Sequence, residues 1–194
     1  MTTSLTPRRP KNPFDLDADL SSILTDEDEF AAPESVNIDS VLKSFETATD
    51  KYVIRYQRDN VSLEDTGIKT PCLKIGKVDF VRLCENIVSN AIKRGFVKDD
   101  EAYELDIKLT VENGFFVITF SNNGEPMPEG MDKARYGTKG VKGVNSDGTG
   151  IGGYIVRSIT QHYGGDYDIS LTKFGDRVIT NVIVKLPIYR TENE

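Results

Sequence analysis

Three polar segments contain the residue types that could bind a phosphorylated ligand. The first is ENIVSNAIKRG at 85–95, in which Asn86, Asn90 and Lys93 are spaced i, i+4 and i+7 and share one face of a helix. Amide oxygens are hard ligands for Mg²⁺, and a lysine ammonium is a point charge for phosphate oxygens. This stripe suits a phosphate group with its metal, although a solvated polar face explains it equally well when the helix is considered alone.

The second segment is SNNGEPMP at 121–128, which follows the strongest strand pattern of the chain. The Asn122 amide can hydrogen-bond to a nucleobase, and Gly124 permits close approach of the backbone. Considered alone, the segment is more readily explained as a simple turn.

The third segment is DGTGIGG at 147–153, which leads into a helix. Its glycines, Gly148, Gly150 and Gly152, leave backbone N–H groups uncovered at a helix amino terminus, where anions such as a triphosphate are favoured. The segment does not follow a strand within a βαβ unit and lacks a GKS or GKT ending. It therefore fits neither the dinucleotide fingerprint nor the P-loop.

Hydrophobic periodicity predicts the elements that position these segments. Helices are expected at 37–49, at 80–94 with Asp79 as its cap, and at 150–162. Strands are expected at 52–57, 71–76, 105–111, 115–120, 166–172 and 177–187, with an Asn113-Gly114 hairpin turn. Hairpins without strict βαβ alternation favour an α+β two-layer sandwich, with a mixed, mostly antiparallel sheet covered by helices on one face.

Composition separates a leader from one folded domain. The chain has 194 residues and a net charge of −7, and its first 35 residues contain eight acidic and three basic side chains. This proline-containing segment at 1–35 is predicted to be a disordered leader, with a short helix at 17–24 as the less favoured alternative. The domain is expected at 36–190, followed by a tail at 191–194, and the irregular glycine-rich loop at 121–150 within it is expected to be functional.

Composition also excludes several classes of protein. The negative charge argues against nucleic acid as a partner, because binding to the phosphate backbone of a nucleic acid requires a basic protein surface. No apolar stretch approaches the roughly 20 residues of a membrane span, and no signal-peptide core is visible at the amino terminus. Cys72 and Cys84 lack ligand spacing and are expected to be reduced core thiols, so the prediction is a cytoplasmic protein.

Taken together and in this order, the three segments resemble the N, G1 and G2 boxes of the catalytic and ATP-binding domain of sensor histidine kinases. That domain belongs to the ATPase superfamily of gyrase, the heat-shock chaperone of ninety kilodaltons and the MutL proteins. The likeness extends over 36–187, about four-fifths of the chain, and includes GTGIGGYIVRSITQHYGG and the closing ITNVIVKLP. The resemblance implies the Bergerat-type ATP-binding fold, with ATP and Mg²⁺ as ligands.

The resemblance also implies individual roles. Asn90 would bind Mg²⁺, with Asn86 at the neighbouring position on the phosphates or the metal, and Lys93 and Arg94 would approach the ribose or phosphates. The triphosphate would lie against Gly148, Thr149, Gly150, Ile151 and Gly152, beneath a lid at about 126–147 that contributes Thr138 and Lys139.

The G1 segment departs from the family pattern. Asn122 would face the adenine amino group, with Gly124 beside it, but the family usually has aspartate at the position of Asn122 and a second glycine at that of Pro126. A neutral acceptor makes a weaker hydrogen bond than a carboxylate. Weaker nucleotide affinity or an altered base preference is therefore expected.

Position 86 separates the reaction classes. Hydrolysing ATPases and the anti-sigma-factor serine kinases of the superfamily have a glutamate base there, whereas Asn86 matches the histidine kinases. Glu85 lies about 100° around the helix, so no catalytic residue is assigned and hydrolysis is expected to be slow. His162 is the only histidine of the chain and precedes Tyr163-Gly164, a context without a phosphoacceptor role.

The prediction is therefore the Mg-ATP-binding catalytic domain of an ATP-dependent protein histidine kinase in a two-component system. Its partner would be a phosphoacceptor domain or a separate regulatory protein that supplies the acceptor histidine. Two alternatives stay open: a stand-alone protein-serine kinase that resembles the anti-sigma-factor regulators, and a degenerate module whose protein interactions depend on nucleotide.

Overall fold

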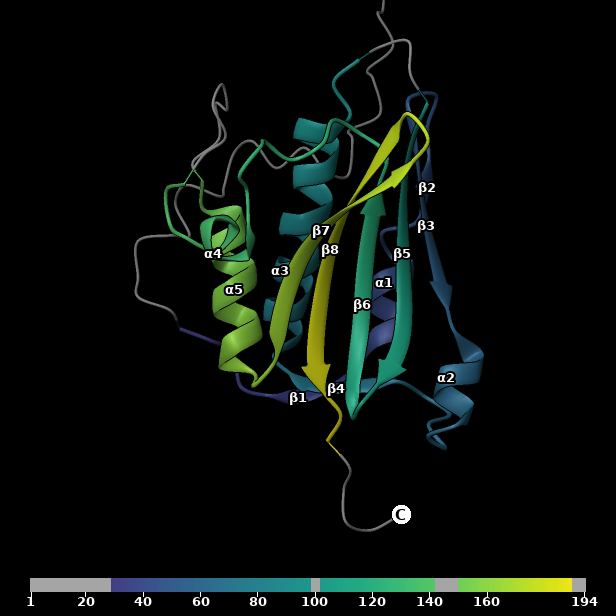
Figure 1. The fold of residues 1–194 in the computed structure, drawn as a ribbon. Coiled ribbons are helices and arrows are strands. Elements are labelled where there is room, and N and C mark those ends of the chain that lie inside the picture. The colour runs from purple at the N-terminus through teal and green to yellow at the C-terminus, as the bar shows by residue number, and fades with distance from the viewer. Residues whose placement is uncertain (1–28, 99–101, 142–149, 190–194) are drawn as a thin grey trace, which may run out of the picture.

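The computed structural model describes residues 29–98, 102–141 and 150–189, and a six-stranded sheet forms one layer of it (Figure 1). The strand order is β2-β3-β5-β6-β8-β7; β3 and β5 pair in parallel, and the other neighbours are antiparallel. The strands are β2 (Thr47–Ala48), β3 (Tyr52–Arg58), β5 (Tyr103–Glu112), β6 (Phe115–Asn122), β7 (Asp166–Phe174) and β8 (Arg177–Pro187). A separate antiparallel pair consists of β1 (Glu34–Asn37) and β4 (Cys72–Ile75).

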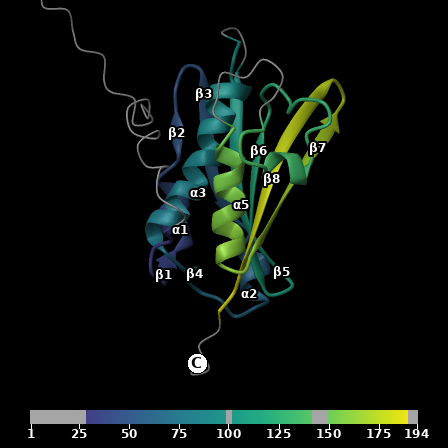
Figure 2. The same cartoon turned by 90° about the vertical axis from the view of Figure 1, so that its left-hand side faces the viewer.

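The helices cover one face of the sheet, as Figure 2 shows, except for the short helix at 60–64, which lies against β5 at the end of the sheet. They are α1 (Ile38–Lys43), α2 (Asn60–Glu64), α3 (Lys77–Asn90), the π-helical turn η1 (Ala91–Gly95), α4 (Lys133–Tyr136) and α5 (Gly152–His162). The long helices α3 and α5 lie side by side and run in opposite directions, so the end of α3 meets the start of α5 (Figure 2). The expected two-layer α+β sandwich with a mixed, mostly antiparallel sheet is confirmed.

The core lies between the sheet and these helices. On β5, the alternate residues Leu105, Ile107 and Leu109 are fully buried, as their period-2 pattern predicts. The following turn has positive φ at Asn113 (50°) and Gly114 (83°), which matches the right-handed twist of the paired strands. The expected hairpin is therefore confirmed.

The first helix is shorter than its sequence pattern predicts. Instead of continuing to about residue 49, α1 ends at Lys43, and Ser44 N and Phe45 N donate to carbonyls three residues back at 3.1 and 3.2 Å. This tighter turn places Phe45 in the core, where it is buried. The chain is then free to form β2, which pairs with β3.

The end of the expected leader is ordered against the domain, which corrects the prediction for residues 29–35. Strand β1 begins at Glu34, Ala31 N donates to Asp79 Oδ2 at 2.8 Å, and Phe30 stacks on His162 with ring centroids 3.8 Å apart. These partners lie far away in sequence, so local composition does not reveal them. Residues 1–28, including the alternative helix at 17–24, and the tail at 191–194 lie outside the described residues.

Asp79 does not cap α3 as expected. The helix starts at Lys77, with Gly76 at the cap position, and Asp79 lies in its first turn, 3% exposed. Its Oδ2 is 2.6 Å from the Tyr163 hydroxyl in addition to the bond from Ala31. The carboxylate therefore joins the first turn of α3 to the residue that follows α5.

The far end of α3 also differs from expectation. The α-helical pattern stops at Asn90, and η1 continues with the wider π-helical spacing. Asn86 and Asn90 keep their shared face, whereas the wider turn rotates Lys93 and Arg94 away from the positions that a 3.6-residue spacing gives. Lys93 thus follows the two asparagines with a spacing different from the helical one that the sequence predicts.

Two general expectations concern cysteines and membranes. Cys84 is buried and Cys72 half-buried, and both are free thiols. Among the described residues, no helix combines the length and apolar character required to cross a membrane.

Candidate functional site

The first and third predicted segments meet where α3 ends and α5 begins. A Cβ placed on Gly152 would lie 3.0 Å from Asn90 Nδ2 and 3.3 Å from Asn86 Oδ1. Asn86 Nδ2 donates to the Arg82 carbonyl at 2.7 Å, which leaves Oδ1 as the free end of that amide. The glycine therefore permits both amides to lie against the first turn of α5.

The second predicted segment contacts the other end of η1. Asn122, the last residue of β6, is 8% exposed, and its Oδ1 accepts from Gly124 N at 3.3 Å. A Cβ on Gly124 would lie 2.5 Å from the Gly95 carbonyl, and Glu125 N donates to that carbonyl at 2.8 Å. Glycine at both positions permits this approach, so the three segments converge on α3 and η1.

Thr180 also belongs to this group, although the three sequence motifs do not include it. It lies opposite Asn122 in the β6–β8 ladder and is 3% exposed, and its Oγ1 is a buried polar atom without a hydrogen-bond partner among the described residues. Asn122 Nδ2 approaches the Thr180 carbonyl at 3.5 Å. The available signal was a lone hydroxyl residue on the apolar face of β8, otherwise occupied by Val182, Val184 and Leu186.

The expected lid segment adds Tyr136 to the two residues, Thr138 and Lys139, that the resemblance implies. Thr138 Oγ1 donates to the Ala134 carbonyl at 2.7 Å, and Lys139 Nζ lies 5.5 Å from the centre of the Tyr154 ring in the first turn of α5. Tyr136 also lies on α5, since a Cβ on Gly153 would be 2.0 Å from its carbonyl oxygen. Its hydroxyl is buried and has no hydrogen-bond partner in the described part of the chain.

The glycine-rich loop is closed at its base. Gly140 N donates to the Gly150 carbonyl at 3.1 Å, and Gly150 has φ +69°, where a Cβ would lie 2.7 Å from the Val141 carbonyl oxygen. Ile151 follows as the cap residue of α5. Gly148 and Thr149 lie outside the described residues.

Charged side chains lie near the convergence, the region where the segments of Asn86, Asn122 and Gly152 meet at α3 and η1. Lys93 and Arg94 on η1 are exposed. Glu85 is half-buried, and burial raises the pKa of its carboxyl. The arrangement offers amide oxygens, cations and glycine backbone to an anionic ligand.

The sequence model of histidine kinase-, DNA gyrase B- and HSP90-like ATPases matches residues 76–190, more than half of the chain. The chain belongs to this family. All three predicted motif segments of the ATPase domain lie within the matched range. No curated protein sequence matches the chain.

The ATPase domain has the fold of solved histidine kinase structures. It covers 32% of full-length ShkA in complex with AMPPNP, with 82% of this chain aligned, a TM-score of 0.61 and 15% identity. It covers 95% of the catalytic domain of histidine kinase ThkA (80% of this chain, TM-score 0.58, 18% identity). It covers 99% of the ATP-binding domain of PrrB from Mycobacterium tuberculosis (82% of this chain, TM-score 0.57, 14% identity). The chain thus spans about a third of the full-length kinase and nearly all of the two isolated domains.

The donor set of the ATPase domain fits a metal that arrives with a nucleotide. Among the described residues, no group of three or more His, Cys, Asp or Glu side chains could hold a metal ion. The donors beside Gly152 are amides, those of Asn86 and Asn90. Mg²⁺ accepts such hard oxygen ligands and takes its remaining ligands from water and phosphate oxygens. These residues therefore suit a magnesium nucleotide better than a free ion.

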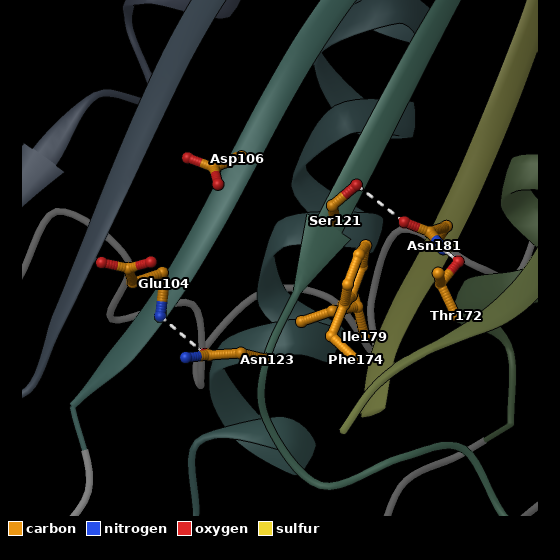
Figure 3. Close-up of a pocket in the computed structure, with 8 residues that line it drawn as sticks. All are labelled: Glu104, Asp106, Ser121, Asn123, Thr172, Phe174, Ile179 and Asn181. Carbon is orange, nitrogen blue, oxygen red and sulfur yellow. Dashed lines mark hydrogen bonds between the residues drawn. The ribbon is translucent and has the colours of Figure 1, made fainter. Parts of the chain in front are cut away.

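A hollow of about 380 Å³ lies on the opposite face of the sheet (Figure 3). It is lined by Glu104, Asp106, Ser121, Asn123, Thr172, Phe174, Ile179 and Asn181. Ser121 Oγ donates to Asn181 Oδ1 at 2.7 Å across β6 and β8 in Figure 3. None of the predicted site residues lines this hollow, because α3 and α5 cover the other face. The hollow and the convergence are separate features.

Proposed function

We propose that the chain is a Mg-ATP-binding catalytic module of the histidine kinase type, which donates the γ-phosphate of ATP to a histidine on another domain or chain. The observation that carries this proposal is the contact of Asn86 and Asn90 with Gly152. It joins hard oxygen ligands to a helix start, where the triphosphate finds unpaired N–H groups.

At the phosphate end, each residue has a distinct role. The Asn90 oxygen would hold Mg²⁺, and the Asn86 oxygen would face the phosphates, since the Asn86 Nδ2 already donates to the Arg82 carbonyl. Lys93 and Arg94 approach phosphate or ribose oxygens from η1. When bound, Mg²⁺ would neutralise negative charge on the phosphates.

At the base end, Asn122 accepts a hydrogen bond from the adenine amino group. The free Thr180 hydroxyl beside it supplies a second polar contact to the base, either directly or through a water. An amide oxygen binds the amino group more weakly than a carboxylate. Modest affinity is therefore expected.

The chemistry of the acceptor supports histidine over serine. An unprotonated imidazole nitrogen attacks the γ-phosphorus with its own lone pair, the bond to the β-phosphate oxygen breaks, and ADP leaves. A serine hydroxyl or a water must lose a proton in the same step and requires a base. Position 86 offers an amide, and Glu85 does not share the face of Asn86 and Asn90.

The test combines nucleotide binding with analysis of the labelled product. We expect calorimetry to show Mg-ATP binding, and radiolabel from γ-labelled ATP to reach a phosphoacceptor domain as an acid-labile, alkali-stable phosphate. An acid-stable label on serine would indicate the serine kinase alternative. Absence of binding at millimolar Mg-ATP would leave a protein interaction module.

A further inference from the structure

We propose that Tyr136 is a positioning residue for the metal ligand: its hydroxyl oxygen accepts a hydrogen bond from the Asn90 side-chain amide and thereby turns the Asn90 oxygen toward Mg²⁺. This inference rests on the proposed function, since it concerns the residue assigned to the metal there. It adds a residue from α4 that lies outside the three motif segments.

Adjacent glycines bring the two side chains to the same turn of α5. Gly152 lies against the Asn90 amide, and the nearest atom to a Cβ on it would be Asn90 Nδ2 at 3.0 Å. The next residue, Gly153, lies under Tyr136, whose carbonyl oxygen and ring carbon Cδ1 would be 2.0 and 3.1 Å from a Cβ there. Tyr136 and Asn90 therefore meet at one turn of backbone that has no side chains to separate them.

Contacts outside the site hold Tyr136 in place. Lys133 Nζ pairs with both carboxylate oxygens of Asp166 at 2.7 Å, and the Tyr167 hydroxyl donates to the Lys133 carbonyl at 2.7 Å. The rings of Tyr136 and Tyr167 lie 6.1 Å apart. These contacts join α4 to β7, so groups outside the proposed nucleotide site hold the Tyr136 ring.

The Tyr136 hydroxyl has the protonation state that its proposed positioning role requires. Burial raises the pKa of Tyr136 to about 12, while the Asn90 amide and the Arg94 charge act in the opposite direction. The group is therefore a neutral phenol at physiological pH, beside the amide and without a hydrogen bond of good geometry in the described residues. A small rotation of the Asn90 amide completes the pair.

The nitrogen and the oxygen of an amide have different roles, which explains how the Tyr136 hydroxyl can orient Asn90. The nitrogen of Asn90 only donates, and its oxygen is the atom that ligates a metal. A hydroxyl that binds the nitrogen fixes which end of the amide faces the ligand, as partners of metal ligands commonly do. Phenylalanine would fill the same space without this control.

The test compares Tyr136→Phe with Tyr163→Phe, which removes another buried tyrosine hydroxyl at the far end of the α3–α5 pair. ATP affinity is measured by calorimetry in Mg²⁺ and in EDTA. We expect Tyr136→Phe to lower the affinity in Mg²⁺ by about 10-fold, in the range found for such partners of metal ligands, and to leave the affinity in EDTA unchanged. We expect Tyr163→Phe to leave both affinities unchanged.

A nucleotide-free measurement separates this inference from the proposed function. We expect the side-chain amide signals of Asn90 in ¹⁵N–¹H NMR spectra to shift in Tyr136→Phe and not in Tyr163→Phe. An unchanged affinity in Mg²⁺, or an equal loss in Mg²⁺ and EDTA, would overturn the positioning role. If the wild-type chain binds no ATP, the proposed function fails, and unshifted Asn90 signals would then overturn the pairing itself.

Discussion

The two ends of the α3–α5 pair are built from similar parts but differ in how their polar groups are satisfied. The clamp end consists of Phe30, Ala31, Gly76, Asp79 and Tyr163, and the site end of Asn86, Asn90, Asn122, Tyr136, Gly152 and Thr180. At the clamp end, Asp79 Oδ2 accepts from Ala31 N, and the Tyr163 hydroxyl lies 2.6 Å from the same oxygen. At the site end, the hydroxyls of Tyr136 and Thr180 are buried and have no hydrogen-bond partner among the described residues.

Close backbone approach does not distinguish the two ends. A Cβ on Gly76 would lie 2.6 Å from the Ala31 Cβ, and one on Gly152 would lie 3.0 Å from Asn90 Nδ2. A buried polar group without a partner costs free energy, so the two hydroxyls at the site end are consistent with a ligand that completes their hydrogen bonds. We therefore expect the clamp end to stabilise the fold, and the proposed site end to bind the ligand at some cost in stability.

The largest expected effect is at the site end. Asn90→Ala removes the proposed metal ligand, and we expect phosphotransfer to fall by on the order of 10²–10³-fold, as for loss of one electrostatic contact to a transition state. We expect the free energy of unfolding to change by less than about 1 kcal/mol, because the side chain is half-buried. Radiolabel transfer and urea unfolding measure the two quantities.

The matched control is Asn181→Ala, which removes an amide in the hollow on the opposite face of the sheet. It should leave phosphotransfer unchanged. Equal rates for Asn90→Ala and the wild type would remove the basis for assigning the site to this end of the helix pair.

The reciprocal change is at the clamp end. Asp79→Ala removes the carboxylate that accepts from Ala31 and Tyr163, and hydrogen bonds to charged groups contribute about 1.5–3 kcal/mol. We expect the free energy of unfolding in urea to fall by about that amount, and the Mg-ATP affinity of the folded protein to stay the same. A loss of affinity without a loss of stability would reverse the roles of the two ends.

Local patterns in the sequence predict most of the site end. The amides of Asn86 and Asn90 follow helical spacing, and Asn122 ends a clear strand, so their convergence requires only the expected sandwich. Tyr136 and Thr180 escaped prediction because an unpaired hydroxyl is a property of its neighbours from other elements. The spacing of residues along the chain therefore does not reveal an unpaired hydroxyl.

The clamp end was predicted less well for a related reason. Asp79 before a helical pattern has the form of a cap, and its competing partners, Ala31 and Tyr163, are 48 and 84 residues away. The π-helical turn after Asn90 likewise has no periodic signal of its own. Tertiary contacts decide each of these features.

A smaller effect comes from comparing two buried threonines. Thr180 has a hydroxyl without a partner, whereas the Thr160 hydroxyl donates to the Val156 carbonyl within α5. We expect Thr180→Val to weaken ATP binding by about 5–10-fold, the value of one hydrogen bond, without loss of stability. We expect Thr160→Val to lower stability by about 1 kcal/mol without changing affinity. Calorimetry measures the affinity and urea unfolding measures the stability. A loss of stability in Thr180→Val together with a loss of affinity in Thr160→Val would contradict the distinction between the ends.

The smallest expected effect separates the tyrosines of the two ends by pH. Burial raises the pKa of Tyr136 to about 12, and burial together with the bond to Asp79 raises the pKa of Tyr163 to about 12. Both groups hold their proton more tightly in the folded chain, so their contribution to stability is complete below pH 10, the ordinary pKa of tyrosine, and is lost as the pH rises toward 12. Removing either hydroxyl should therefore make the alkaline fall in unfolding free energy shallower.

The two variants should differ at neutral pH, which is the informative comparison. Tyr163→Phe loses a satisfied bond to Asp79, so we expect a loss of about 1 kcal/mol at pH 7. Tyr136→Phe loses only the proposed bond from the neutral Asn90 amide, which lacks good hydrogen-bond geometry in the free chain, so we expect a loss of less than about 0.5 kcal/mol there. Urea unfolding from pH 7 to 11 measures both. Equal losses at pH 7 would mean that the two hydroxyls are satisfied equally well in the free protein, which would contradict the distinction between the two ends.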